Sequence, residues 1–316
     1  MKILVAGANG FVGRALCAEL IKQGLTILAA VREKATLENC IPFVIGDINH
    51  ATNWSTALSG VDVVIHLAAR VHIMNDTSAD PLAEFRKINV EGTLNLARQA
   101  ANAGVKRFIF VSSVKVNGEH TEAGKPFNEN SITDPQDAYG ISKLEAEQSL
   151  LKIAQETGME VVIIRPPLVY GAGVKANFAS MMRAVRRGIP LPLGAIHNKR
   201  SFVYVGNLVS VIMCCIDNPA AANQVFMVSD GNDLSTTQLL RSCAAALGVK
   251  ARLLPLPQKL LEIGAALLGK RDVAQRLCGS LQVDITKART MLGWTPPFSV
   301  ADGLKATALS LFNLDK

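Results

Sequence analysis

Tyr139 and Lys143 lie four residues apart at the start of "DAYGISKLEAEQ" (137–148), a segment whose composition is typical of a helix. Residues at positions i and i+4 share a helix face. A tyrosine has an unperturbed pKa of about 10, and a nearby ammonium group lowers that pKa because it favours the phenolate. Such a pair can exchange a proton with an alcohol or a ketone. The spacing alone does not distinguish this chemistry from two solvated surface side chains.

Two hydroxyl groups could assist such a proton transfer. Ser112 and Ser113 end the apolar run "RFIFVSS" (107–113), which is typical of a buried strand. In α/β folds, ligands bind at the carboxyl ends of parallel strands, so we expect both hydroxyls near a substrate. A hydroxyl at that place can orient a substrate oxygen and stabilise the negative charge that develops on it.

The elements that position these residues alternate along the first half of the chain. Apolar runs rich in β-branched residues predict buried parallel strands at 2–6, 26–31, 42–46, 62–68, 107–113 and 160–166. Helical patterns between them predict helices at 11–23, 81–103 and 137–157. This alternation predicts an α/β fold with a Rossmann-type, doubly wound parallel sheet, which we assign to residues 1–168.

The second half of the chain has a looser pattern with more Pro and Gly. Helices are expected near 176–187, 207–217, 235–247 and 257–268, joined by short strands. We expect residues 169–316 to form a smaller, mixed lobe that mainly binds substrate. Some of its segments are expected to return to the first domain.

The first expected strand leads into a glycine-rich turn. Gly7, Gly10 and Gly13 follow the pattern G-x-x-G-x-x-G between that strand and the first helix. Glycine permits a sharp turn and lets the backbone approach a pyrophosphate at the helix N-terminus. Because this strand–turn–helix context is the one that the motif requires, the turn predicts a dinucleotide site.

The end of the second expected strand bears on the choice of dinucleotide. Val31 stands where enzymes that use NAD usually carry an acidic residue, and Arg32 follows it. A guanidinium can pair with a 2′-phosphate, which favours NADP(H), whereas Glu33 could bind the ribose and keeps NAD(H) open. Asp47, in "GDI" after the third strand, is expected to contact the adenine, although a strand-end or helix-cap role is the alternative.

The charge of the chain is unevenly distributed. The net charge is +7; residues 1–150 hold 14 basic and 16 acidic residues, and residues 151–316 hold 19 and 10, giving balances of −2 and +9. There is no long basic run with interleaved aromatic residues, so we expect no nucleic-acid partner. A phosphate-bearing small molecule would account for the excess in the second half, as would solvated helix faces.

Cysteine spacing and hydropathy exclude further classes of protein. The six cysteines show no spacing typical of a metal site or a disulfide framework. The longest apolar stretches fall short of the roughly 20 residues that span a bilayer. The apolar start of the chain is interrupted by Gly7, Asn9, Gly10 and Arg14, unlike a secretory signal. We therefore expect a cytoplasmic protein without membrane insertion and without a bound metal.

Taken together, these motifs resemble the extended short-chain dehydrogenase/reductase family, in particular its nucleotide-sugar epimerases, dehydratases and reductases. The resemblance covers nearly the whole chain. The shared motifs are the glycine turn, "GDI" (46–48), "HLAA" (66–69), Asn89 in "NVEGTLNL", the serine pair, Tyr-x-x-x-Lys, "RPPLVYG" (165–171) and "KRSFVYVGNL" (199–208).

The resemblance implies a role for each matching residue. Tyr139 would be the acid/base, Lys143 would tune it and bind the nicotinamide ribose, and Ser113 would be the catalytic hydroxyl. Further cofactor contacts are implied for motif residues, namely Asn9, Phe11, Val12, Ile48, Leu67, Ala68, Ala69, Asn89, Ser112 and Pro166.

The resemblance also implies a partner and an assembly. The partner would be a nucleotide-diphosphate sugar, with contacts from Ser113, Asn177, Arg200 and Arg276. Two residues depart from the pattern: Asn117 replaces a usual tyrosine, and Lys115 stands where small residues are frequent, either solvated or directed toward substrate. A homodimer through helices 81–103 and 137–157 is expected.

Two reactions fit these residues. "SSVKVNGE" (112–119) and "GSLQVDITKARTMLGWTPP" (279–297) look like segments of bacterial UDP-sugar 4-ketoreductases. With Arg32, they favour NADPH-dependent reduction of the C4 ketone of a UDP-4-keto-6-deoxy-N-acetylhexosamine for surface polysaccharide, such as lipopolysaccharide. The alternative is a UDP-hexose 4-epimerase, acting on UDP-glucose or UDP-N-acetylglucosamine with tightly bound NAD. A dehydratase is not expected, because no Asp/Glu pair follows Ser113.

Overall fold

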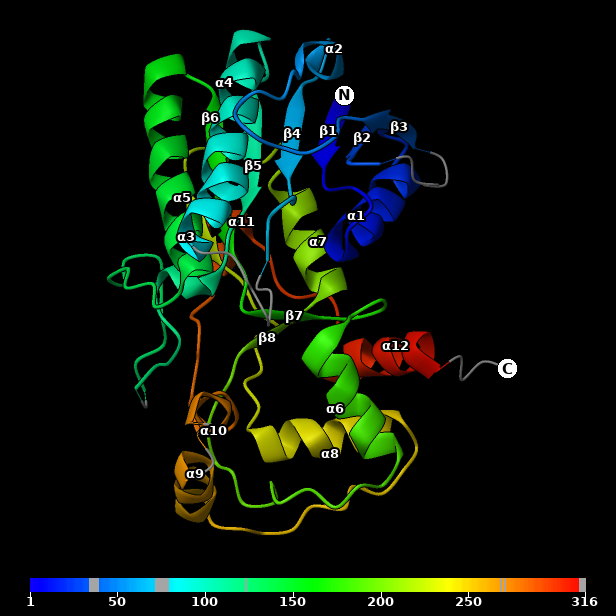
Figure 1. Ribbon diagram of the computed structural model, residues 1–316. Coiled ribbons are helices and arrows are strands. Elements are labelled where there is room, and N and C mark those ends of the chain that lie inside the picture. The colour runs from blue at the N-terminus through cyan, green and yellow to red at the C-terminus, as the bar shows by residue number, and fades with distance from the viewer. Residues whose placement is uncertain (34–39, 72–79, 123, 268, 270, 313–316) are drawn as a thin grey trace.

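The computed structural model describes residues 1–33, 40–71, 80–122, 124–267, 269 and 271–312. Its centre is a parallel sheet of seven strands in the order β3-β2-β1-β4-β5-β6-β9 (Figure 1). The strands are β1 (Lys2–Ala6), β2 (Thr26–Val31), β3 (Ile41–Val44), β4 (Val63–His66), β5 (Arg107–Val111), β6 (Glu160–Arg165) and β9 (Val225–Met227). The predicted Rossmann-type, doubly wound sheet is confirmed.

Helices cover both faces of this sheet, which is why its strands are apolar throughout. Along β1, Ile3 and Val5 pack into one hydrophobic cluster, while Leu4 and Ala6 pack into another on the opposite face. The first cluster includes side chains of α1 (Phe11–Lys22), α7 (Val205–Cys214) and α11 (Thr286–Leu292). The second includes side chains of α2 (Ser55–Leu58), α4 (Thr93–Asn102) and α5 (Ala138–Thr157).

The sheet has a switch point at β1. This strand pairs with β2 on one side and with β4 on the other, so the chain crosses over in opposite directions from it. Ligands of open α/β sheets bind outside the carboxyl ends of the strands at such a point. The glycine turn, the end of β4 and the serine pair after β5 all lie at this edge.

The predicted helix 81–103 has three parts. α3 (Pro81–Arg86) continues through a π-helical turn, η1 (Lys87–Gly92), into α4. Asp80 caps α3, because its carboxylate accepts a hydrogen bond from the backbone N–H of Ala83 at 3.0 Å. π-helical turns widen a helix locally and often occur at functional sites. Here the turn contains Asn89.

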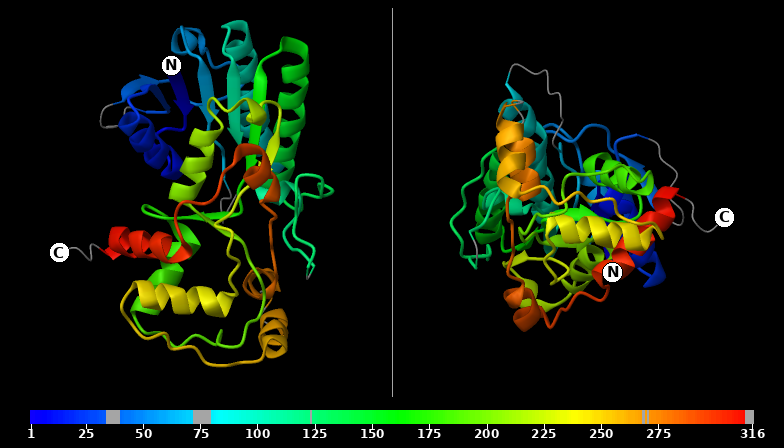
Figure 2. Two further views of the ribbon diagram at one scale, coloured as in Figure 1. Left: turned by 180° about the vertical axis from the view of Figure 1, so that it is seen from behind. Right: turned by 90° about the horizontal axis from the view of Figure 1, so that it is seen from below.

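A smaller lobe lies below the sheet (Figures 1 and 2). It contains the paired strands β7 (Leu168–Tyr170) and β8 (Phe202–Tyr204). Its helices are α6 (Ala176–Arg186), α8 (Thr236–Ala246), α9 (Gln258–Leu267), α10 (Arg271–Cys278) and α12 (Val300–Phe312). A third hydrophobic cluster joins α6, α8 and α12 through side chains such as Phe178, Leu239 and Leu304. Short 3-10 turns, η2 (Val114–Val116) and η3 (Pro219–Ala221), complete the described elements.

The second half of the chain contains elements that the sequence did not predict. β9 is three residues long and joins the large sheet beside β6, and α10, α11 and α12 were also missed. The predicted end of helix 257–268, at residue 268, lies outside the described residues. The domain boundary at residue 168 stays a prediction, although α7 and β9 contribute to the upper layers. Within the described ranges, no helix has the length and apolar character needed to cross a membrane.

Candidate active site

The turn between β1 and α1 leaves no room for a side chain at Gly7 or at Gly13. Gly7 has a φ of +88°, and a Cβ atom there would lie 2.7 Å from the backbone nitrogen of Ala68. A Cβ atom on Gly13 would lie 2.2 Å from the carbonyl oxygen of Gly7. Gly10 begins α1 without a side-chain cap, so backbone amides of the first helical turn face outward from the helix end. The close-packed turn therefore fits the pyrophosphate of a dinucleotide. Asn9, Phe11 and Val12 are at least partly exposed in the same turn.

Three charged side chains gather beyond the end of β2. The Arg32 guanidinium lies 3.9 Å from the Asp47 carboxylate and 4.0 Å from the Glu33 carboxylate. All three side chains are well exposed, while Val31 is buried. Among the described residues, two carboxylates lie beside one guanidinium here, so the charge of these three side chains is negative. That charge suits ribose hydroxyls better than a 2′-phosphate.

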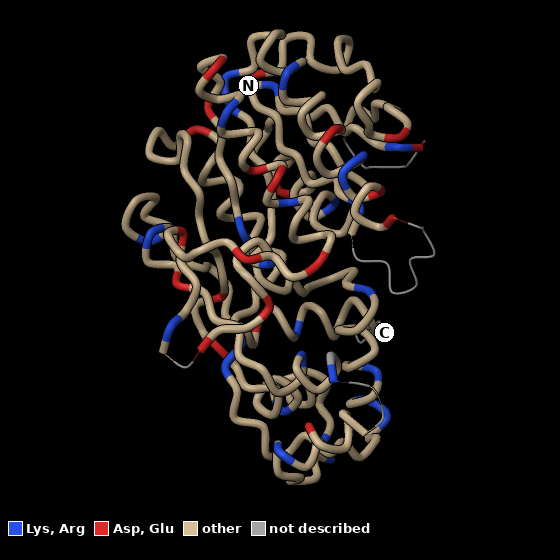
Figure 3. The backbone as a smooth tube through the Cα atoms, turned by 60° about the vertical axis from the view of Figure 1, so that its left-hand side comes forward, with Lys and Arg blue, Asp and Glu red and all other residues tan. Residues whose placement is uncertain are grey.

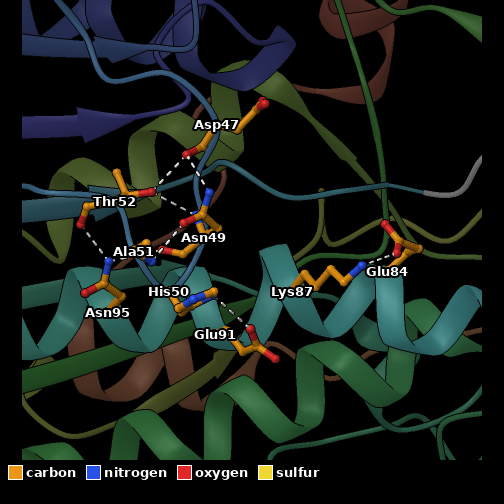
Figure 4. Close-up of polar contacts among 9 residues, drawn as sticks. All are labelled: Asp47, Asn49, His50, Ala51, Thr52, Glu84, Lys87, Glu91 and Asn95. Carbon is orange, nitrogen blue, oxygen red and sulfur yellow. Dashed lines mark hydrogen bonds and ion pairs between the residues drawn. The ribbon is translucent and has the colours of Figure 1, made fainter.

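The loop that carries Asp47 and Ile48 is fixed by hydrogen bonds to α4 (Figure 4). The Thr52 hydroxyl donates to the carbonyl oxygen of Asp47 at 2.8 Å, and the Asn95 amide donates to the carbonyl oxygen of Thr52 at 2.7 Å. Figure 4 shows the Asp47 carboxylate pointing away from this network. Ile48 packs on Gly92, and a Cβ atom built on Gly92 would lie 2.7 Å from Cγ2 of Ile48. The loop is thus rigidly held, with one carboxylate directed outward.

The segment after β4 lies beside the glycine turn. The backbone N–H groups of Leu67 and Ala68 both donate to the carbonyl oxygen of Ala6, at 2.9 and 3.0 Å. Leu67, Ala68 and Ala69 are partly exposed, so they can line a cofactor site.

Asn89 ties this segment to the helix that carries Tyr139. Its Oδ1 accepts from the Arg70 N–H at 2.8 Å, and its Nδ2 donates to the Arg70 carbonyl and to the Ser142 hydroxyl, both at 3.0 Å. Ser142 donates in turn to the carbonyl oxygen of Tyr139 at 2.8 Å. The buried Asn89 side chain, predicted to contact the cofactor, therefore acts as a brace in this structure.

The predicted acid/base pair lies at the start of α5. Asp137 caps this helix by accepting a hydrogen bond from the Gly140 N–H at 2.7 Å. The Lys143 ammonium donates to the Val111 carbonyl oxygen at 2.7 Å and lies 3.9 Å from the centre of the Phe110 ring. Both contacts anchor α5 on the carboxyl end of β5.

Ser113 completes the group. Its hydroxyl lies near enough to the Tyr139 side chain to lower the pKa of that tyrosine. It also accepts from the Lys115 N–H at 3.2 Å and so caps the short turn η2. The structure therefore brings Ser113, Tyr139 and Lys143 together at one sheet edge, from two different elements.

Burial dominates the electrostatics of this group. Desolvation raises the pKa of Tyr139 to about 12; the Asp137 carboxylate also raises this pKa, and the Ser113 hydroxyl lowers it. Desolvation lowers the pKa of Lys143 to about 7, against the opposing charge of Glu147. The sequence predicted that Lys143 lowers the pKa of Tyr139; instead, burial and Asp137 raise this pKa, and Lys143 is not among the groups that shift it. The Lys143 ammonium is directed at the Val111 carbonyl and the Phe110 ring.

Ser112 and Pro166 directly follow the adjacent strands β5 and β6, at the same edge of the sheet. The Ser112 N–H donates to Ile164 at 2.7 Å, and the Val114 N–H donates to the Pro166 carbonyl at 2.9 Å. The Ser112 hydroxyl is buried, and no residue that the structure describes forms a hydrogen bond with it. A buried hydroxyl of this kind fits a polar group of a bound cofactor.

The structure places the Lys115 side chain beside two carboxylates, whereas the sequence left open whether it is solvated or directed toward substrate. Its ammonium pairs with Asp137 and lies 2.9 Å from Glu119. Lys115 therefore contacts the carboxylate that caps α5. The Asp137 cap was missed in the sequence, although Asp three residues before Gly140 is a recognisable N-cap pattern.

A buried ion pair braces α5 one turn further along. The Arg165 guanidinium lies 2.6 Å from the Glu147 carboxylate, with side chains only 7% and 3% exposed. Asn117, which departs from the family pattern, accepts from Arg165 at 3.2 Å and donates to Ser131 at 3.2 Å. No local pattern indicated this pair, because its partners are separated by 18 residues and lie on a helix and a strand.

The predicted substrate contacts are spread over the lower lobe. Arg200 is partly buried and donates to the carbonyl oxygen of Gly279 at 3.0 Å; burial lowers its pKa, and the charge of Glu119 opposes that shift. Asn177 is exposed near the start of α6, and Arg276 is exposed on α10. α6 and α10 lie on different sides of the lobe (Figure 1). Of these three residues, Arg200 is close enough to Glu119 for that carboxylate to act on its pKa. Glu119 in turn contacts the Lys115 ammonium.

Comparisons with known proteins agree with this geometry. Residues 3–229 match the model of the NAD dependent epimerase/dehydratase family. A UDP-glucose 4-epimerase of Vibrio cholerae is 50% identical over 308 residues, which are 97% of this chain and 94% of that protein.

Two further proteins extend the comparison. The N-acetyl-alpha-D-glucosaminyl-diphospho-ditrans,octacis-undecaprenol 4-epimerase of Escherichia coli O157:H7 is 30% identical, over 96% of this chain and 93% of that protein. The crystal structure of UDP-glucuronic acid 4-epimerase from Bacillus cereus, in complex with NAD, superposes with a TM-score of 0.79 at 23% identity and covers 100% of both chains. The latter likeness establishes the fold.

Proposed function

We propose, because the chain belongs to the NAD dependent epimerase/dehydratase family, that it is a UDP-hexose 4-epimerase. The observation that carries this proposal is the 50% identity, over 97% of the chain, to a UDP-glucose 4-epimerase. Ser113, Tyr139 and Lys143 at one edge of the sheet provide the groups that such a reaction needs.

Each of the three residues has a distinct task in this proposal. A bound nicotinamide dinucleotide supplies the acceptor and donor of hydride. The Tyr139 oxygen takes the proton of the C4 hydroxyl and returns it after inversion, and the Ser113 hydroxyl orients the C4 oxygen. The Lys143 ammonium, held by Val111, supplies positive charge that favours the phenolate.

NAD is the dinucleotide that we propose for this site. Gly7, Gly10 and Gly13 would hold the pyrophosphate, and Asp47 would contact the adenosine end. Arg32 already faces two carboxylates, and a 2′-phosphate would have to approach both. The sequence favoured NADP(H) because of Arg32 and kept NAD(H) open because of Glu33; the Asp47 carboxylate beside Arg32 adds a second negative group.

The reductase reading, which the sequence placed first, is the second candidate. Arg32 remains the observation in its favour, since its well-exposed guanidinium at the end of β2 could still pair with a 2′-phosphate. The identity to the Vibrio cholerae epimerase favours the epimerase. Reduction of a UDP-4-keto-6-deoxy sugar and a role in surface polysaccharide are therefore kept as the alternative.

The cofactor that remains on the purified protein decides between the two reactions. The released dinucleotide is identified by mass, and UDP-glucose is then supplied without added dinucleotide while NMR follows the formation of UDP-galactose. The epimerase proposal expects retained NAD and interconversion that Tyr139→Phe abolishes. NADPH consumption in step with a 4-keto sugar, without retained NAD, would instead establish the reductase.

The sugar could be carried on more than one diphosphate. The Escherichia coli relative is named for a sugar on a polyprenyl diphosphate, whereas the Vibrio cholerae relative is named for UDP-glucose. Both substrates share a hexose on a diphosphate, so the same three residues would act on either. We further propose a homodimer through α3–η1–α4 and α5, which sedimentation velocity would test.

A further inference from the structure

The first residue of α1 contacts both parts of the molecule. Phe11 opens this helix directly after the glycine turn, on the side of the sheet that faces the lower lobe (Figure 1). Its side chain is partly buried and packs against the third hydrophobic cluster, in the lower lobe. The next apolar residues of the helix, Val12 and Ala15, pack instead against the first cluster, on one face of the sheet. Among the residues that the structure describes, Phe11 is the only member of the third cluster that comes from before β7.

The loop that follows β7 brings the lower lobe up to Phe11. A Cβ atom built on Gly173 would lie 3.8 Å from Cδ2 of Phe11, which is ordinary van der Waals contact. The Val174 N–H donates to the carbonyl oxygen of Gly171 at 3.1 Å and so closes the loop. The Val174 side chain is buried in the third cluster, against which Phe11 packs. The phenyl group of Phe11 therefore lies in the contact between the glycine turn and the lower lobe.

The same cluster supports the part of the lower lobe that we expect to bind substrate. Asn177, a predicted contact of the nucleotide-diphosphate sugar, is exposed near the start of α6. Its neighbour Phe178 is buried and stacks on Tyr170, with ring centres 5.3 Å apart. Phe178 and Tyr170 both belong to the third cluster. Basic residues predominate over acidic ones in the lower lobe, which suits a diphosphate (Figure 3). A nucleotide bound at the start of α6 would thus rest on the cluster that also holds Phe11.

We infer that Phe11 couples the retention of the dinucleotide to the binding of the UDP part of the substrate. The inference rests on the proposed function, from which it takes both ligands. Each ligand favours the packed position of the Phe11 side chain: the dinucleotide acts through the backbone of the glycine turn, and UDP acts through the cluster under α6. Two ligands that favour the same state strengthen each other's binding by the same factor. Because both hydride transfers of an epimerase use one dinucleotide, this coupling would keep it bound while a sugar is present.

The rate at which the purified holoenzyme loses NAD measures this coupling. The protein is dialysed with and without saturating UDP, and the NAD that remains per chain is followed over time. UDP should slow the loss of NAD from the wild-type protein by at least about fivefold, the lower end of typical couplings between sites. Phe11→Ala should lose NAD at least about tenfold faster, because the glycine turn then lacks its apolar contact with the lower lobe. UDP should slow the loss from this variant by less than about twofold.

Phe312→Ala is the matched control. Phe312 is also a partly buried phenylalanine that packs against the third cluster, but it lies at the end of α12. This variant should lose NAD at the wild-type rate and respond to UDP as the wild-type protein does. Phe11→Leu keeps an apolar side chain in the contact and should recover most of the coupling. In both Phe11 variants, Val12 and Ala15 still hold α1 on the sheet.

Two results would overturn the inference. The first is a wild-type protein from which UDP does not slow the loss of NAD, a result that needs no variant. The second is a Phe11→Ala protein that responds to UDP as wild type does, or a Phe312→Ala protein that loses the response. Turnover of UDP-glucose on the same samples separates the two proposals. Failure of the proposed function would appear as absent interconversion while UDP still slows dinucleotide loss, and failure of the inference as normal interconversion without that effect.

Discussion

The start of α5 and the hairpin formed by α9 and α10 differ in which side chains they bury. At the start of α5, polar groups are buried and paired: Asn89 forms three hydrogen bonds, and Lys143 is held at 2.7 Å by Val111. In α9, aliphatic groups are exposed and no residue is buried. The first arrangement fixes the geometry of the candidate site before any ligand binds, and the second leaves the side chains of α9 exposed. Substitutions should therefore affect chemistry and stability much more in the first region than in the second.

The largest effect is expected from the Tyr139 hydroxyl. Tyr139→Phe removes the proton donor and acceptor but keeps the ring, so kcat should fall by about 10²- to 10⁴-fold. Dinucleotide retention should stay intact, because the glycine turn is on another element. Tyr204→Phe in the lower lobe is the matched control and should keep its activity. Steady-state kinetics and the retained NAD per chain measure both outcomes, and an active Tyr139→Phe enzyme would refute the assignment.

Breaking the buried ion pair should have the largest effect on stability. Glu147→Ala leaves the Arg165 guanidinium buried without its carboxylate, which should lower the free energy of unfolding by about 3–5 kcal/mol. Glu262→Ala in α9 removes an exposed carboxylate that accepts a hydrogen bond from Gln258. This substitution should change the free energy of unfolding by less than about 0.5 kcal/mol. Urea unfolding of both variants measures the contrast. Equal losses would show that the two regions do not differ as the structure indicates.

The burial of Lys143 should lower the free energy of unfolding at the pH values where its amine is protonated. Burial lowers its pKa to about 7, below that of the unfolded chain, so the unfolded state binds more protons between about pH 7 and 10.5. Wild-type stability should therefore rise with pH across this window. Lys143→Met lacks this group, so it should be more stable than wild type at pH 6, and the difference should shrink as the pH approaches 10.5. Thermal unfolding at several pH values checks this.

A control for the Lys143 result lies on the same helix. Lys152 is 76% exposed, so Lys152→Met should show no such pH-dependent gain. The Lys143→Met protein should also lose turnover despite its added stability. A Lys143→Met protein that is no more stable than wild type at pH 6 would mean that the ammonium is not desolvated as its contacts indicate.

The sequence predicted the parts of the fold and site that depend on local patterns. The apolar strands and the glycine turn were readable because spacing and residue type determine them, and Ser113 and Tyr139 were found at a shared sheet edge. The ion pair of Arg165 and Glu147 was not readable, since it depends on how α5 packs against β6. β9 was missed because a three-residue strand has too short a pattern.

The smallest predicted effect concerns the charge that caps α5. Asp137 raises the pKa of Tyr139, so Asp137→Asn, which keeps a capping side chain, should lower that pKa. The limb of the kcat/KM profile that reports Tyr139 should move to lower pH, by less than about one unit. Lys115→Met should move it in the opposite direction, because the Asp137 carboxylate then lacks its ammonium partner. Lys115→Arg should restore the wild-type profile. Shifts in the same direction for Asp137→Asn and Lys115→Met would mean that both residues act through the position of α5, and not through charge at Tyr139.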